Sequence, residues 1–276
     1  MRECRTITIT WLLLAALPLA LTGCGAPEGG SGASTSAFTF DAAAFPGAKP
    51  WTSESFTNDP DAFQFAVLGD RGGGASPKGT YERAMEQLNW MQPEFVMTVG
   101  DFVEGYTSEQ SEMDAQWEEM EAIVEKLEMP FFYVRGNHDI NMPLTRKAWT
   151  DRRGPQYYWF RYKDVLFVAL DTEDAERPMP ENMEEDINTY NRLKKEDPKK
   201  AMAFIIEWMK TPEAQEAFGH AAKVEFPESQ RAWFRRVLED NQDGRWTCVF
   251  LHDPVWDYPS DSCTESDAAI QGRADT

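Results

Sequence analysis

Histidine is scarce in this sequence. Its 276 residues include only three, so few metal ligands or proton carriers of this type are available. Basic residues are also few, because 27 Lys and Arg stand against 47 Asp and Glu, a net charge of −20. Such acidity argues against nucleic-acid binding and against a polybasic membrane-binding face. The apolar run from Trp11 to Leu21 is too short for a comfortable transmembrane helix.

Aromatic residues, by contrast, are plentiful. They make up 13% of the chain and include 10 Trp, a composition typical of a folded protein. The length suits one good-sized domain plus a tether, and it is long enough for a large core. The excess of acidic groups also suits divalent cations, although we expect most of this charge on solvated helix surfaces.

The first 23 residues have the pattern of a targeting segment. Arg2 and Arg5 precede the short apolar run, and the sequence around Cys24 resembles the processing box of bacterial lipoproteins. This predicts a signal peptide at 1–23, cleavage before Cys24 and lipidation of its sulfur. The alternative is a plain secretory signal followed by a chance cysteine. Residues 24–50 are then the lipidated Cys and a flexible, Gly/Ser/Ala-rich tether, and 51–276 the main domain.

Two cysteines remain after Cys4 is cleaved away and Cys24 is acylated. Cys248 falls in an expected core strand and Cys263 in a polar loop. An oxidising cell envelope would permit a disulfide between them. The alternating position of Cys248 favours a buried free thiol instead.

Four apolar, strand-like runs end in polar residues of the kinds that bind metals or carry protons. Such runs read as buried strands, and open α/β sheets place their ligands at the carboxyl ends of strands. We therefore expect one site where these four ends meet. The runs and their polar ends are Phe63–Gly69 before Asp70, Glu94–Gly100 before Asp101, Phe131–Val134 before Asn137, His138 and Asp139, and Trp246–Leu251 before His252.

Helices and a hairpin are expected between these runs. Helix-like patterns cover 78–91, 108–128 and 227–239, and two strands at 157–162 and 165–170 flank a two-residue turn. The alternation of strands and helices predicts a layered α/β architecture. A charged segment at 173–226 reads as a helical insertion, either a lid or a packing element. His220 within it is expected to be a surface or cap residue.

The order Gly-Asp, Gly-Asp, Gly-Asn-His-Asp and His-Asp-Pro resembles the calcineurin-like metallophosphoesterases, which include the purple acid phosphatases. The resemblance covers about residues 63–258. It implies a layered α/β/β/α sandwich of two mixed sheets flanked by helices. It also implies two divalent metal ions (Mn, Fe, Zn or Mg) and a phosphate-ester substrate.

The resemblance also implies roles for particular residues. Asp101 would bridge the two metals, and Asp139 would orient His138. His138 would either protonate the leaving oxygen or stabilise the phosphorane-like charge. Arg71 would hold phosphate oxygens, although a structural salt bridge is the alternative for it. The implied metal ligands are Asp70, Asp101, Asn137 and His252, and the implied catalytic residues are His138, Asp139 and Arg71.

Two departures from the family pattern weaken the first metal position. The family has a His two residues after its first Asp, where this chain has Gly72, and no Gly-His-x-His follows His252. Either the chain is truncated at its C-terminus or the site has decayed. We favour truncation for the missing motif and subfamily variation for Gly72.

The leading expectation is therefore metal-dependent hydrolysis of phosphate mono- or diesters by a lipid-anchored protein of the bacterial cell envelope. The alternative is a weakly active or non-catalytic lipoprotein of the same fold that binds a phosphorylated ligand or partner. A purely structural role leaves the four strand-end residues unexplained.

Overall fold

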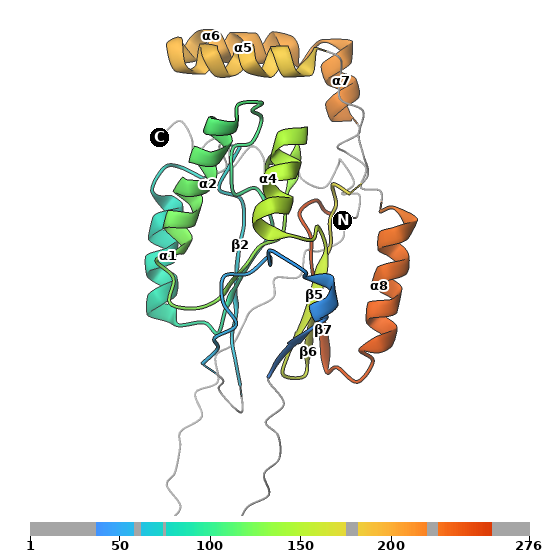
Figure 1. Cartoon of the computed structure of the whole chain (residues 1–276). Coiled ribbons are helices and arrows are strands. Elements are labelled where there is room, and N and C mark those ends of the chain that lie inside the picture. Colours follow the sequence, from blue (N-terminus) through green and yellow to red (C-terminus); the bar gives the residue numbers. More distant parts are fainter. Residues whose placement is uncertain (1–36, 58–61, 74–75, 175–181, 220–225, 256–276) are drawn as a thin grey trace, which may run out of the picture. The chain divides into compact units, whose positions relative to one another are not determined.

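The computed structural model describes residues 37–57, 62–73, 76–174, 182–219 and 226–255 (Figure 1). Contacts divide the chain into residues 1–35 and 36–276, and the second part forms a compact unit by itself. The signal peptide, Cys24, His220 and Cys263 lie outside the described residues. Within the described ranges, no helix combines the length and the apolar character needed to cross a membrane.

One sheet consists of three short parallel strands in the order β2-β3-β4. They are β2 (Ala66–Leu68), β3 (Val96–Thr98) and β4 (Phe131–Phe132). The helices α1 (Thr80–Met91) and α2 (Gln110–Val124) form the crossovers between them. Because the strands are parallel, the polar residues that follow them gather at the same edge of the sheet.

The other sheet is mixed and has the order β1-β5-β6-β7. Its strands are β1 (Phe38–Phe40), β5 (Tyr158–Tyr162), β6 (Val165–Ala169) and β7 (Trp246–Phe250). β1 and β6 are antiparallel to β5, whereas β7 is parallel to β6. The predicted hairpin is confirmed, with Lys163 in its turn at a φ of 54°.

Aromatic side chains fill the space between the two sheets. Period-2 alternation turns Phe132 and Phe95 of the first sheet toward Phe160 and Phe167 of the second. The ring centroids are 4.3 Å apart for Phe132 and Phe160, and 5.1 Å apart for Phe95 and Phe167. The two sheets therefore share one buried aromatic layer.

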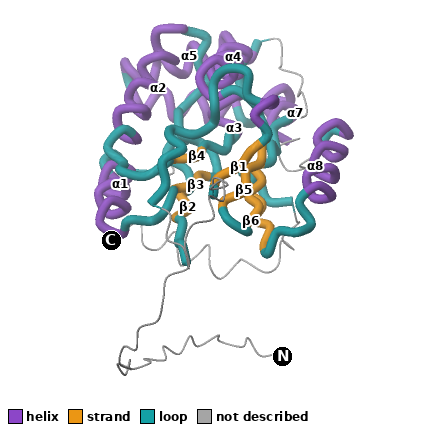
Figure 2. Tube along the Cα trace, turned by 60° about the horizontal axis from the view of Figure 1, so that its bottom comes forward, coloured by secondary structure: helices purple, strands orange, loops and turns teal. Residues whose placement is uncertain are grey.

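Helices cover the outer faces of both sheets (Figure 2). α1, α2 and α4 (Pro143–Arg153) pack on the three-stranded sheet, and α8 (Glu228–Asp240) packs on the mixed sheet. This arrangement confirms the predicted α/β/β/α sandwich, with one correction. The three-stranded sheet is parallel rather than mixed, because each connection between its strands is a crossover.

The predicted helical insertion contains three helices within the described residues. They are α5 (Met183–Glu196), α6 (Pro198–Trp208) and α7 (Pro212–Gly219). α5 and α6 pack against each other, and Trp208 Nε1 donates a hydrogen bond to Asp186 across them at 2.8 Å. The described residues also form a short helix, α3 (Asn137–Ile140), and a 3-10 helix, η1 (Ala42–Ala44).

The predicted boundary of the tether at residue 50 is wrong. β1 pairs with β5, and Phe38 and Phe45 are buried in the aromatic layer together with Trp51. The domain therefore begins before residue 38. The strand β1 was missed because three residues are too short for a periodic pattern.

Candidate metal centre and active site

The residues that follow β2, β3, β4 and β7 converge as predicted. Ligand atoms of Asp70, Asp101 and His252 all lie within 4.8 Å of one another. The side chain of Asn137, at the start of α3, joins them through its Oδ1 atom, 3.0 Å from His252 Nε2. The side chains of Asp101 and His252 are 7% and 9% exposed, whereas that of Asp70 is 41% exposed. The cluster is thus closed toward the core and open beside Asp70.

Glycines allow the loops after β3 and β4 to touch. Gly100 has a φ of 106°, in the region that favours glycine, and a Cβ built on it would lie 2.7 Å from the backbone of Gly136. Asp101 itself adopts a φ of 58°, uncommon for a residue other than glycine. This left-handed turn directs the Asp101 carboxylate to the backbone N–H of His138, which donates to Oδ1 at 2.9 Å.

His252 presents one ring nitrogen to this cluster. Its Nδ1 atom lies 2.7 Å from the carbonyl oxygen of Val99. A carbonyl can only accept, so Nδ1 carries the hydrogen and the Nε2 lone pair of the neutral ring faces Asn137. The Nε2 atom is also 3.4 Å from Asp101 Oδ2.

This donor set fits a divalent cation. When the imidazole is neutral, three atoms with lone pairs face one another without a hydrogen between them: His252 Nε2, Asn137 Oδ1 and Asp101 Oδ2. Such an arrangement is repulsive unless positive charge lies among the atoms. Mixed oxygen and imidazole ligands suit ions such as Mn, Fe and Zn.

The pKa shifts in the cluster have identifiable causes. Burial raises the pKa of Asp101, and the nearby His252 and His138 lower it by less. For His252, burial lowers the pKa, but the Asp101 carboxylate, the hydrogen bond to the Val99 carbonyl and the charges of Asp253 and Asp70 together outweigh it, so the net shift is upward. Both pKa values are thus raised, so each of the two groups holds its proton more tightly than usual.

His138 lies beside the cluster and is held in the same way as His252. Its Nδ1 atom lies 2.7 Å from the carbonyl oxygen of Glu104, which leaves Nε2 free. A Cβ built on Gly73 would lie 2.8 Å from this Nε2 atom, so glycine at this position leaves the nitrogen uncovered by a side chain. His138 can therefore exchange a proton at Nε2 with a group bound in the opening.

A family model described as calcineurin-like phosphoesterase matches residues 63–272, which is most of the chain. The chain belongs to the calcineurin-like phosphoesterase family. Family membership makes it a metal-dependent phosphohydrolase of the metallophosphoesterase type.

Other comparisons give less. No curated protein matches the sequence. Among solved structures, one that matches is a dimetal phosphatase from Danio rerio, with 16% sequence identity, coverage of 76% of this chain and 76% of that chain, and a TM-score of 0.46.

Asp139 of this phosphoesterase does not have the predicted role of orienting His138. Its buried carboxylate accepts four backbone hydrogen bonds, each oxygen taking two. Oδ2 accepts from Asp101 N and Gly136 N, both at 2.9 Å, and Oδ1 accepts from Phe102 N at 2.9 Å and Val103 N at 3.3 Å. Asp139 therefore ties together the loops after β3 and β4. The carbonyl of Glu104 holds His138 instead, and no side-chain pattern could reveal a backbone partner.

Arg71 forms a structural salt bridge, which was the alternative to phosphate binding. Its guanidinium donates to Glu119 on α2 at 2.7 Å and to the carbonyl of Phe102 at 3.2 Å. Both contacts hold the loop after β2 in place. The phosphate-binding role predicted for Arg71 is accordingly not supported by its position.

The backbone explains why the phosphoesterase has glycine at position 72. Gly72 N donates to the carbonyl of Asp101 at 2.7 Å, and a Cβ built there would lie 2.2 Å from the carbonyl oxygen of Val103. A histidine therefore does not fit at this position without movement of the backbone. The missing family ligand follows from how closely the loops after β2 and β3 pack.

Tyr106 is a residue of the site that the sequence analysis missed. Its ring meets that of His138 edge to face, with centroids 4.9 Å apart. Burial raises the pKa of Tyr106, while side-chain hydrogen bonds with Asn137 and Asn141 lower it by less. Asn191 of α5 donates to its carbonyl at 2.7 Å. Tyr106 has a positive φ of 42° and follows Gly105, which also has a positive φ. In the sequence, this Gly-Tyr pair was the available sign of a tight turn beside the site.

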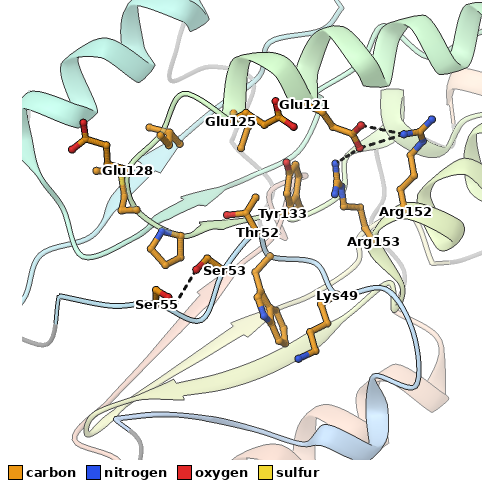
Figure 3. Close-up of a pocket in the computed structure, with 15 residues that line it drawn as sticks. Lys49, Thr52, Ser53, Ser55, Glu121, Glu125, Glu128, Tyr133, Arg152 and Arg153 are labelled. Atoms are coloured by element: carbon orange, nitrogen blue, oxygen red, sulfur yellow. Dashed lines mark hydrogen bonds and ion pairs between the residues drawn. The ribbon is translucent and has the colours of Figure 1, made fainter.

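A separate cavity of about 620 Å³ lies away from these residues. It is bordered by the segment from Lys49 to Ser55, by α2 and by α4, and Figure 3 shows Glu121 paired with Arg152 and Arg153 at its wall. Its charged residues are three glutamates and three basic residues, so the lining has no excess of either sign. None of the predicted site residues lines it.

Proposed function

We propose that this chain hydrolyses phosphate esters at a two-metal centre and that lipids on Cys24 hold it on a bacterial cell envelope. The observation that carries the catalytic part is the convergence of Asp70, Asp101, Asn137 and His252 at four strand ends, beside His138. Phosphate mono- or diesters are the proposed substrates.

The ligands divide unequally between two metal positions. We assign Asp101 to both positions, Asp70 to the first, and Asn137 with His252 to the second. Because no side chain fits at Gly72, the first position has only two protein ligands among the described residues. We expect it to bind its ion more weakly than the second.

The chemistry is a displacement at phosphorus by water. Bound divalent ions would neutralise phosphate charge and lower the pKa of the attacking water. As the water oxygen bonds to phosphorus and the ester P–O bond breaks, His138 delivers a proton from Nε2 to the leaving alkoxide. The Glu104 carbonyl accepts the hydrogen bond from Nδ1 and keeps the ring in place throughout.

The test of this role is His138→Ala with a series of leaving groups. Hydrolysis of alkyl phosphates, which have poor leaving groups, should slow by about 10²–10⁴-fold, and hydrolysis of p-nitrophenyl phosphate by much less. The metal content should remain near that of the wild type, because His138 is not an assigned ligand. A metal-loaded protein that hydrolyses neither p-nitrophenyl phosphate nor its bis-ester would favour binding of phosphorylated ligands without turnover.

The anchor is tested separately with Cys24→Ala. Wild-type protein should be extracted with membranes, and the variant should not, because the several acyl chains of a lipoprotein supply most of the attachment. Metabolic labelling with a fatty acid should mark only the wild type. A variant that stays in the membrane fraction at the wild-type level would contradict lipidation at Cys24.

A further inference from the structure

The outer face of α6 carries apolar side chains that the domain leaves exposed. Met202, Ile206 and Met209 are 56%, 50% and 44% exposed, and they recur at intervals of four and three residues along one side of the helix. The opposite side of α6 packs inward through Ala201 and Trp208. The contacts of the helix therefore fix which face is turned outward.

Lysines lie at both ends of this apolar face. Lys199 and Lys200 stand in the first turn of α6, and Lys210 follows its last turn. Residues 197–210 contain three Lys and two Asp or Glu, in a chain whose net charge is −20. The general argument from acidity against a basic membrane face therefore does not hold for this segment.

The ion pairs of these lysines are exposed and leave the charges available. Lys200 lies 3.7 Å from Asp197 and Lys210 lies 2.6 Å from Glu207, and the side chains of the two lysines are 74% and 62% exposed. Exposed pairs contribute little, so a lipid phosphate can replace the carboxylate partner at small cost. Lysine side chains also extend easily from an apolar surface toward a charged one.

We propose that the outer face of α6 (Lys199, Met202, Ile206, Met209 and Lys210) docks on an anionic lipid surface. The apolar side chains would enter the interface while the flanking lysines meet lipid phosphates. Such a small patch binds weakly by itself. For a chain attached through Cys24, as proposed above, it would act as a second contact that orients the domain; the docking itself is independent of that anchor and of catalysis.

The test uses residues 36–276, which form a compact unit of their own, and flotation with vesicles. We expect binding to phosphatidylcholine vesicles that contain phosphatidylglycerol and little binding to phosphatidylcholine alone. The double substitution Met202→Ser with Ile206→Ser should weaken binding at least about tenfold. Lys199→Gln should weaken it about fivefold. Binding to the anionic vesicles should weaken as the salt concentration rises, because salt screens contacts between surface charges.

Two matched controls carry the same kinds of substitution on helices other than α6. Trp90 and Met91, at the end of α1, are 81% and 61% exposed, and their double substitution to serine should leave binding unchanged. Lys147 on α4, with a side chain 70% exposed, provides the same control for charge through Lys147→Gln. Circular dichroism and thermal unfolding confirm that each variant is folded.

Three results would overturn the proposal. They are absence of binding to the anionic vesicles, equal loss of binding in the α1 control, and self-association of the protein in solution that depends on Met202 and Ile206. The last result would assign the face to a second copy of the chain. Phosphoesterase activity enters none of these measurements, so failure of the proposed function and failure of this proposal can be told apart.

Discussion

His252 and His138 are oriented by the same simple device. In each ring Nδ1 lies 2.7 Å from a backbone carbonyl, of Val99 and Glu104 respectively, and Nε2 is presented to the site. Backbone carbonyls move little and do not titrate, so they fix both the tautomer and the ring direction. One nitrogen of each histidine thus remains available, in His252 for a metal and in His138 for a proton.

Tyr106→Phe tests whether metal binding at the site depends on the hydroxyl group of Tyr106. The substitution keeps the ring beside His138 and removes the hydroxyl that bonds to Asn137 and Asn141. We expect metal affinity to fall by roughly tenfold, because Asn137 loses the partner that orients its amide. Titration calorimetry measures this effect. Tyr157→Phe, at a tyrosine away from the site, is the control, and equal affinities for all three proteins would remove Tyr106 from the site.

At the scale of the elements, Asp139 joins the loops that carry two of the candidate ligands, Asp101 and Asn137. One carboxylate holds the backbone of residues 101–103 and the N–H of Gly136. Burial and the negative charge of nearby Asp101 together raise the pKa of Asp139 to about 7, although the backbone N–H groups that bond to it act in the opposite direction. The ends of β3 and β4 therefore depend on a single side chain.

Asp139→Asn should accordingly unfold more easily than the wild type. Either orientation of the amide places an NH₂ group against two backbone N–H donors, so we expect a loss of about 3 kcal/mol in the free energy of unfolding. Chemical denaturation followed by tryptophan fluorescence measures it. Asp164→Asn, at the exposed turn between β5 and β6, is the matched control and should change stability by less than about 0.5 kcal/mol. A loss no larger in Asp139→Asn than in the control would contradict the role of Asp139 in joining these two loops.

The elements could be predicted from the sequence where a pattern was long enough. The hairpin β5–β6, the crossover helices and the ends of the buried strands follow from alternation and amphipathic spacing. α4 was missed, although Pro143 at its start and Gly154 after its end are helix boundary signals. β1 could not be found in three residues.

Within the site, only the candidate metal ligands could be predicted from the sequence. Asp70, Asp101, Asn137 and His252 could be placed together because parallel strands end at one edge. The roles of Asp139 and Gly72 could not be predicted, because they depend on backbone groups brought close by the fold. For Arg71 a salt bridge was an open alternative, but its partner Glu119, 48 residues away, could not be identified. Carbonyls and N–H groups are identical at every position of a sequence, so only the structure reveals which of them a side chain meets.

At the scale of the whole molecule, buried phenols predict sensitivity to alkali. Burial raises the pKa of Tyr133 to about 12, and it also raises those of Tyr81 and Tyr158. Above a pH of about 10 the unfolded chain loses these protons while the folded chain retains them. Stability should therefore fall as the pH rises from about 10 toward about 12, by up to about 1.4 kcal/mol per pH unit for each phenol.

Tyr133→Phe separates this effect from the titration of other groups. Its free energy of unfolding should decrease less steeply than that of the wild type between about pH 10 and about pH 12, since one phenol no longer ionises in the unfolded chain. Denaturation curves at several pH values give both slopes. Parallel slopes for the two proteins would show that Tyr133 ionises as easily in the folded state as in the unfolded one.

The position of His252 on β7 sets the order in which the metal centre can be completed. Asp70, Asp101 and Asn137 lie at the ends of the three-stranded sheet, whereas β7 pairs with β6 in the other sheet. During synthesis the first three are available long before residue 252 emerges, and His252 reaches Asn137 across 115 residues of chain. A newly made chain therefore lacks its imidazole ligand until the second sheet has closed over the first. Retention of a cation would thus report that the sandwich is assembled, and the opening of either sheet would release it.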